Sequence, residues 1–116
     1  MMKKILLSLL WGLMLVFALG ASCSKNSTPN TVVTSTVTIQ NSAFNPATIT
    51  IARGGVITWK NLDSTTHQII TDGNLPELES GQIDQNGTFS FTFNNTGTYD
   101  YHCNIHPIMK GEIIVK

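Results

Sequence analysis

Residues 99–111 read YDYHCNIHPIMKG, and this stretch decides both the fold and the chemistry of the chain. In its first half, two tyrosines and Cys103 alternate with polar residues, which is the period of a β-strand with one buried face. In its second half, His106 and Met109 follow Cys103 at intervals of three residues, around a proline. The stretch therefore predicts a strand that ends at Cys103 and continues into a short loop of potential metal ligands.

The two-residue period recurs along the chain from Thr36 onward. Apolar residues alternate with threonine or serine in three further runs, namely Val37/Ile39, Ile49/Ile51 and Phe89/Phe91/Phe93. Glycine-containing turn sequences stand between the runs: Gly54-Gly55, Asp72-Gly73 and Asn86-Gly87. There is no segment of helical period longer than two turns. The pattern predicts an all-β sandwich of about seven strands.

Composition narrows the function. The chain has 116 residues, 41% of them hydrophobic, which is enough for one packed domain. Its formal net charge is zero and it has no basic cluster, which argues against a nucleic acid partner. Paired carboxylates, a nucleophile with its base, and a phosphate-binding loop are all missing from the pattern. We therefore expect a protein that is not an enzyme.

The N-terminus has the pattern of an export signal. Lys3 and Lys4 precede a 17-residue apolar run from Ile5 to Ala21. This run is shorter than the ~20 residues that usually span a bilayer. Residues 1–22 are thus predicted to be a signal peptide, and a retained membrane anchor is the alternative.

Cys23 directly follows the apolar run. A disulfide with Cys103 is the default expectation for two cysteines in an exported protein. However, the sequence Leu19-Gly20-Ala21-Ser22-Cys23 resembles the lipobox of bacterial lipoproteins, with Leu19 one residue further from the cysteine than is usual. This resemblance implies that Cys23 is lipidated and anchors the protein to a membrane, which leaves Cys103 free for another role.

The remaining chain divides into a linker and a domain. Residues 24–35 are mostly serine, threonine and asparagine, with little to bury. Residues 23–35 are therefore predicted to be the lipidated cysteine and a flexible linker. The folded domain is predicted over 36–116, in the periplasm or cell envelope.

One thiol, two imidazoles and one thioether form an unusual set of side chains. His67 lies upstream, after a polar loop, and joins Cys103, His106 and Met109 as a candidate ligand. Each residue alone has an ordinary explanation as a core or surface residue. Together they suit copper, because soft sulfur favours Cu(I), imidazole serves both copper states, and a Cys-His-His site with a weak axial Met is the blue-copper arrangement. Zinc prefers sites without a thioether.

The chain resembles the cupredoxins, and among them the amicyanin-like members with a short Cys-x-x-His-x-x-Met loop. The likeness covers nearly the whole folded region, including Phe44-Asn45-Pro46, the sequence GGVITWKN of residues 54–61, and residues 99–111. It implies a Greek-key β-sandwich, one copper ion, and single-electron transfer between redox partners. A copper-binding protein for periplasmic buffering or delivery is the alternative. The family's ligands correspond to His67, Cys103, His106 and Met109.

The resemblance also assigns supporting residues. Asn61 is expected to point inward and tie the two ligand loops together, although a structural role is equally open. Gln68 stands where the family usually has Asn. Its backbone N–H should still bond the cysteine sulfur, because that bond does not depend on the side chain. Whether its side chain also bridges the two loops, as the family's Asn does, is left undecided by the sequence. His102 should face away from Cys103 by strand alternation.

The loop around His106 also predicts how partners meet the protein. Ile105, Pro107 and Ile108 surround this histidine with apolar side chains. An exposed apolar patch of this kind usually marks a docking site. We expect redox partner proteins to dock there on a monomer.

Overall fold

The computed structural model describes residues 32–73 and 78–116. Within these ranges all the regular structure is β-strand. The strands are β1 (Thr34–Gln40), β2 (Ala43–Asn45), β3 (Thr48–Ile51), β4 (Val56–Asn61), β5 (Ile69–Thr71), β6 (Thr88–Thr92), β7 (Gly97–Cys103) and β8 (Lys110–Val115). The predicted signal peptide, Cys23 and most of the predicted linker lie outside the described residues. In the part of the chain that is described, there is no helix of the length and apolarity needed to cross a membrane.

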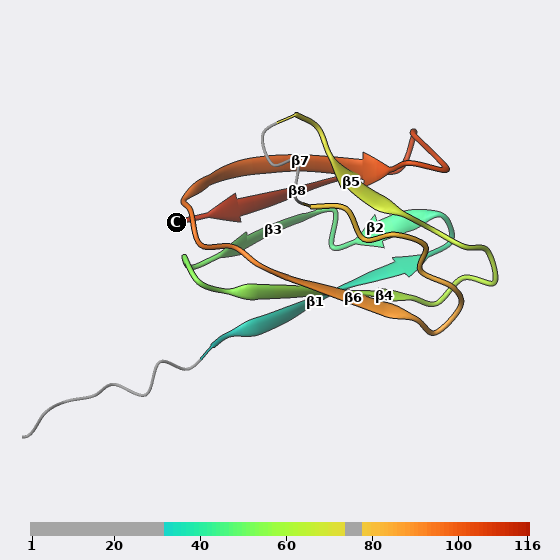
Figure 1. The fold of residues 1–116 in the computed structure, drawn as a ribbon, viewed down its shortest axis with the longest axis horizontal. Coiled ribbons are helices and arrows are strands. Elements are labelled where there is room, and N and C mark those ends of the chain that lie inside the picture. The colour runs from blue at the N-terminus through green and yellow to red at the C-terminus, as the bar shows by residue number, and fades with distance from the viewer. Residues whose placement is uncertain (1–31, 74–77) are drawn as a thin grey trace, which may run out of the picture.

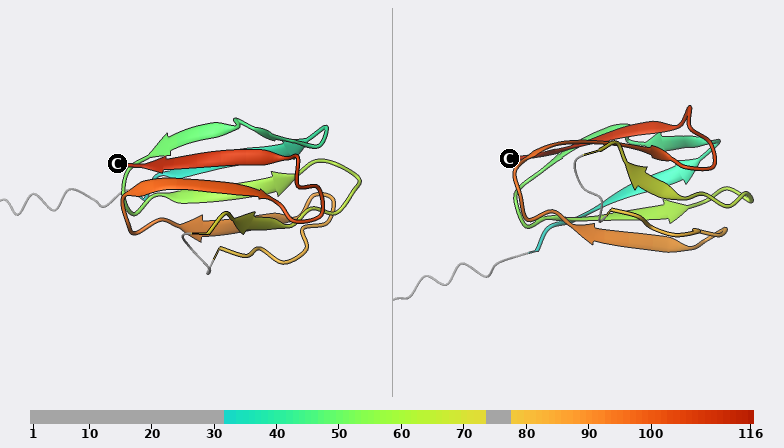
Figure 2. Two further views of the ribbon diagram at one scale, coloured as in Figure 1. Left: turned by 90° about the horizontal axis from the view of Figure 1, so that it is seen from above. Right: turned by 45° about the horizontal axis from the view of Figure 1, so that its top comes forward.

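The strands form two four-stranded sheets that face each other (Figure 1). One sheet has the strand order β2-β1-β4-β6 and the other has the order β3-β8-β7-β5. The four strands of the second sheet lie side by side in the left view of Figure 2. The pairs β1–β4 and β3–β8 are parallel and the other neighbours are antiparallel. The prediction of an all-β sandwich is confirmed.

The core lies between the sheets and follows the predicted alternation. Every second residue is buried throughout β4 and β8, and also in β1 from Val37 and in β7 from Tyr99, because successive side chains of a strand point to opposite faces. The completely buried apolar side chains are Val37, Ile39, Ile57, Trp59, Ile69, Tyr101, Cys103 and Ile113. Cys103 is therefore part of the core as well as a candidate ligand.

Two features of the N-terminal half differ from the prediction. First, β1 begins at Thr34, so the strand includes the last two residues of the expected linker, Thr34 and Ser35, which pair with β4. Second, the short strand β2 brings the number of strands to eight. It forms a hairpin with β1 through Asn41 and Ser42, which both have φ of 54°. Such a turn favours positive φ at both central residues, and without a glycine it gave no turn signal.

The sandwich collects the candidate ligands at one end. Cys103 is the last residue of β7, and the loop to β8 carries His106 and Met109. His67 lies in the connection from β4 to β5, two residues before Ile69, which is the register partner of Cys103. Figure 1 shows both connections at the end of the sandwich opposite the C-terminus.

Candidate metal centre

The structure brings His67, Cys103 and His106 together. Nδ1 of His67 lies 3.6 Å from Sγ of Cys103, and Nδ1 of His106 lies 3.7 Å from the same sulfur. The three ligand atoms all lie within 4.8 Å of one another. His67 and Cys103 are fully buried, whereas His106 is half-buried. Cys103 is a free thiol. It is thus available to a metal.

These separations fit one small metal ion. In zinc sites, nitrogen ligands lie about 2.0 Å and thiolate sulfur about 2.3 Å from the metal. Two such bonds that meet at about 110–120° place their ligand atoms roughly 3.5–3.7 Å apart. The measured sulfur–nitrogen distances of 3.6 and 3.7 Å match this value. Across residues 32–73 and 78–116, this is the one group of three such side chains close enough to share a metal.

Backbone hydrogen bonds hold the loop from Cys103 to Met109 in shape. The N–H of Cys103 donates to the carbonyl of Met109 at 3.0 Å, and the N–H of Met109 donates to the carbonyl of His106 at 2.9 Å. Met109 is buried although it follows the exposed residues Pro107 and Ile108. The loop therefore turns its methionine back into the protein.

A second pair of backbone bonds fixes His67. Its N–H donates to the carbonyl of Ile83 at 3.1 Å, and the N–H of Ile83 donates back to its carbonyl at 2.7 Å. Ile83 is itself buried in the core. The backbone of the upstream ligand is therefore paired even though His67 lies outside the main strands.

Gln68 joins the two ligand loops. Its backbone N–H lies 3.5 Å from Sγ of Cys103, as expected from the resemblance. Its carbonyl accepts the N–H of Asn104 at 2.8 Å, and its side-chain oxygen accepts Nδ2 of Asn104 at 3.3 Å. The side-chain amide in turn donates to Glu79 at 3.0 Å. A side-chain bridge between the loops is thus present, built from Gln68 and Asn104.

Asn61 points inward as expected but makes different connections. It is completely buried, and its Nδ2 donates to the carbonyls of Thr65 at 2.8 Å and Ile83 at 2.9 Å. Its Oδ1 accepts the N–H of Asp63 at 2.9 Å. These bonds organise the loop before His67 and the segment that pairs with it. Among the hydrogen bonds of the described residues, none joins the Asn61 side chain to the loop after Cys103, so these contacts favour the structural role that the sequence left equally open.

Sequence reasoning missed Asp63. Its Oδ2 lies 3.0 Å from Nε2 of His67, on the opposite side of the ring from the sulfur. The backbone N–H groups of Ser42 and Asn41 donate to the same carboxylate at 2.9 and 2.7 Å. The N–H of Ser42 above all lowers the pKa of Asp63, which keeps it ionised at neutral pH. The sequence did contain a signal for this contact, namely a carboxylate four residues before a candidate ligand histidine. Histidines that bind a metal usually donate their other ring N–H to a carboxylate, a carbonyl or a water.

His102 faces away from the cluster, as alternation predicts. It is half-buried on the outer side of its sheet and pairs through Nδ1 with the carboxylate of Asp72. This residue is therefore placed apart from the ligand atoms.

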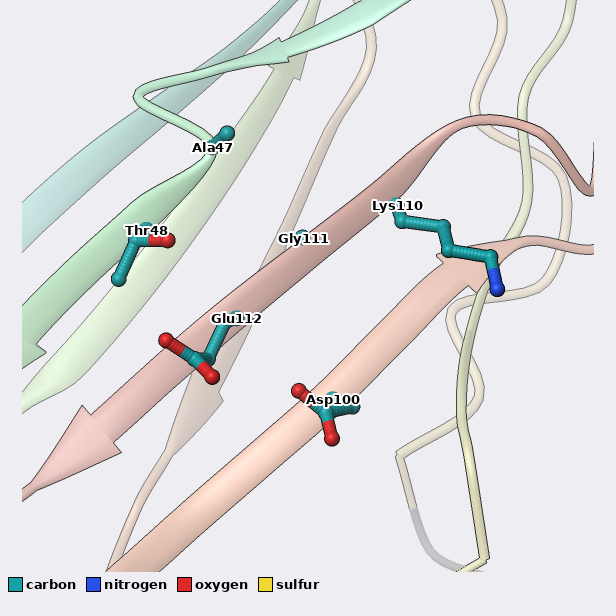
Figure 3. A pocket seen from close by; sticks show the side chains of 6 residues that line it. All are labelled: Ala47, Thr48, Asp100, Lys110, Gly111 and Glu112. Atoms are coloured by element: carbon teal, nitrogen blue, oxygen red, sulfur yellow. The ribbon is translucent and has the colours of Figure 1, made fainter.

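A shallow depression on the same sheet does not coincide with the candidate site. Figure 3 shows its lining, with the carboxylates of Asp100 and Glu112, the side chain of Lys110, and Thr48 at its edge. None of the three clustered ligands lines it. The ligand atoms instead lie packed in the end of the sandwich, where a metal ion, not an open hollow, would fill the space between them.

The chain matches known proteins of one family. Residues 12–115 match the family model of the cupredoxin-like domain. Amicyanin-alpha of Methylorubrum extorquens is 34% identical over 83 residues, which cover 69% of this chain and 70% of that protein. Amicyanin of Paracoccus denitrificans is 36% identical over 66 residues, covering 54% of this chain, and the match spans half of that protein's length.

Solved structures give the same result. A reduced Cu(I) form of an amicyanin mutant at pH 4 superposes with a TM-score of 0.66 at 31% identity, over 70% of this chain and 80% of that one. Sequence, fold and the clustered thiol and imidazoles thus point the same way. The chain belongs to the cupredoxin family and lies close to the amicyanins.

Proposed function

We propose that this protein transfers single electrons on one copper ion held by His67, Cys103, His106 and Met109. The observation that carries the proposal is the cluster of one sulfur and two ring nitrogens within 4.8 Å. The donor set suits copper because it combines thiolate and thioether sulfur with imidazole. A copper ion held there would supply a one-electron couple between Cu(II) and Cu(I). The solved amicyanin in its Cu(I) form supports the choice of metal.

The protein's part is to hold the ligands still. His67 is paired with Ile83, and Cys103 closes its loop by its bond to Met109. Gln68 adds an N–H toward the sulfur and a bridge to the loop after it. Ligands fixed by a β framework need little rearrangement when the charge of the site changes by one. This rigidity favours fast electron transfer over a bond-making reaction, so we infer no catalytic step.

The electron's exit is proposed to be the edge of His106. This residue is half-buried, and its neighbours Ile105 and Ile108 are 44% and 91% exposed. Pro107 is exposed between them. Apolar side chains around the least buried ligand support a docking surface where redox partners bind weakly and separate quickly.

The location of the protein is proposed from the sequence alone. The apolar run and Cys23 support export to the periplasm or cell envelope and attachment to a bacterial membrane by a lipid. One complete set of candidate ligands in a single chain supports action as a monomer.

The proposal is tested by loading the protein with copper and recording its absorption spectrum during a redox titration. A short copper–thiolate bond gives an intense charge-transfer band, so the oxidised protein should be blue and should lose its colour on one-electron reduction. Cys103→Ser should abolish the band, whereas Ser35→Ala, far from the ligands in sequence, should leave it unchanged. A colourless Cu(II) complex would contradict the proposal. Loss of copper to an acceptor protein on contact would favour the delivery function instead.

A further inference from the structure

We infer that Asp63 is a positioning residue that holds His67 in its ligating form and shifts the copper couple toward Cu(II). This inference rests on the proposed function for its redox part. It concerns a residue that lies outside the ligand set and whose contacts join three separate segments of the chain.

The first step is the orientation of the ring. Nδ1 of His67 faces Sγ of Cys103 at 3.6 Å, and Nε2 faces Oδ2 of Asp63 at 3.0 Å. An ionised carboxylate can only accept hydrogen bonds, so the proton of the neutral imidazole belongs on Nε2. Nδ1 is then left with the lone pair that a metal needs. The hydroxyl of Thr65 lies further from Nε2, at 3.5 Å, and can either donate or accept. The carboxylate therefore decides which nitrogen carries the proton.

The second step is the rigidity of the carboxylate. Its Oδ1 accepts the N–H of Asn41 at 2.7 Å, and its Oδ2 accepts the N–H of Ser42 at 2.9 Å. These two amides belong to the turn between β1 and β2, which has positive φ at both residues. The N–H of Asp63 itself bonds the buried side chain of Asn61. Asp63 is thus held in place by the β1–β2 turn and by the end of β4. The carboxylate in this position then orients the ring of His67.

The third step is the effect of charge. His67 is completely buried and the side chain of Asp63 is 15% exposed, so water screens their interaction only partly. A negative charge beside a ligand stabilises the more highly charged metal state. A hydrogen bond from the distal nitrogen to a carboxylate also makes the ligand more basic. Both effects favour Cu(II), so Asp63 should lower the reduction potential of the site.

The test compares Asp63→Asn with Asp84→Asn in the copper-loaded protein. Asp84 is a matched control because its carboxylate accepts the hydroxyl of Thr66, next to His67, but does not touch the ring. Both variants are held at the ambient potential where the wild type is half oxidised. There the ratio of reduced to oxidised protein should be at least about 10:1 for Asp63→Asn, which equals a 59 mV rise in reduction potential for one electron. Asp84→Asn should stay near half oxidised. An equal shift in both variants, or no shift in Asp63→Asn, would overturn the inference.

A second measurement needs neither copper nor a variant. Long-range ¹H–¹⁵N NMR spectra of the metal-free wild type should show a proton on Nε2 of His67, the nitrogen that faces Asp63. A proton on Nδ1 would overturn the positioning role. If Asp63→Asn does not fold, the NMR spectrum of the wild type decides the matter. A protein without blue copper would contradict the proposed function alone, since the NMR result would still report on Asp63.

Discussion

The ring of Tyr101 occupies the space beside the α-carbon of Gly111. A Cβ placed on Gly111 would lie 2.2 Å from Cζ and 2.3 Å from Oη of the tyrosine. The two residues are register partners across β7 and β8. Tyr101 is completely buried and packs edge-on against Trp59, with ring centroids 5.5 Å apart. The glycine therefore leaves room for a core tyrosine two residues from Cys103.

Gly111→Ala should destabilise the fold strongly. The added methyl group meets a ring that is enclosed by the core and cannot swing away. Overpacking typically costs about 1–3 kcal/mol, and the contact here predicts a loss of about 3 kcal/mol or more in the free energy of unfolding. Chemical denaturation of the metal-free protein measures it. Glu112→Ala, at the next, outward-facing position, should cost well under half as much. Equal losses in the two variants would contradict the packing argument.

Replacing Met109 should tune the potential without removing the metal. Met109→Leu removes the thioether that is proposed as a weak ligand, so the copper protein should stay blue while its reduction potential rises, because the remaining ligands stabilise Cu(II) less. Met109→Gln supplies an oxygen donor and should lower the potential. Voltammetry of both variants checks the two signs. Loss of copper from the leucine variant would mean that Met109 binds strongly and that the site is of another type.

Ile108→Lys should slow electron exchange while sparing the site. When two copies exchange an electron through the apolar surface around His106, each would bring a lysine charge into the contact. We expect the self-exchange rate, measured by NMR line broadening of mixed Cu(I) and Cu(II) protein, to fall roughly fivefold or more. The blue spectrum should not change.

Val33→Lys provides the control for this experiment. Val33 is 59% exposed and precedes β1. Its replacement by lysine therefore also exchanges an exposed aliphatic side chain for a positive charge, but away from the ligand loop. Its self-exchange rate should match the wild type at moderate salt. A similar decrease in both variants would show that net charge, not the patch, governs the encounter.

Cys23→Ser should move the protein from membranes to the soluble periplasmic fraction, because the proposed lipid supplies the attachment. Ser24→Ala, at the neighbouring position, should remain with the membranes. Fractionation followed by immunoblotting distinguishes the two. A serine variant that still sediments with membranes would indicate that the apolar run is retained as an anchor.

The sequence predicted the features that depend on short spacing. Alternation placed Tyr101 and Cys103 on one face, and the intervals of three residues placed His106 and Met109 in one loop. The cluster with His67 required more than spacing, because the cysteine lies 36 residues away. There the resemblance to a family supplied what periodicity could not.

What the sequence did not reveal depends on contacts between distant segments. Asp63 meets its backbone donors in a turn about twenty residues earlier, and nothing in the local pattern marks that meeting. In the same turn the residues with positive φ are Asn41 and Ser42. Because neither is a glycine, the sequence did not indicate the turn, and strand β2 after it was overlooked as well. Asn61 was rightly expected to be buried, but its partners follow from how the loop folds over it, which alternation does not encode.

The strand β1 enters the sandwich at the end opposite the β7–β8 loop (Figure 1). With the lipid proposed at Cys23, this arrangement would determine how the domain is oriented on a membrane. The linker predicted between Cys23 and β1 would, as a flexible chain of about ten residues, span roughly 17 Å on average, so the N-terminal end of the domain would stand close to the bilayer. The histidine edge would then point outward, toward freely diffusing donors and acceptors and away from proteins buried in the same lipid layer.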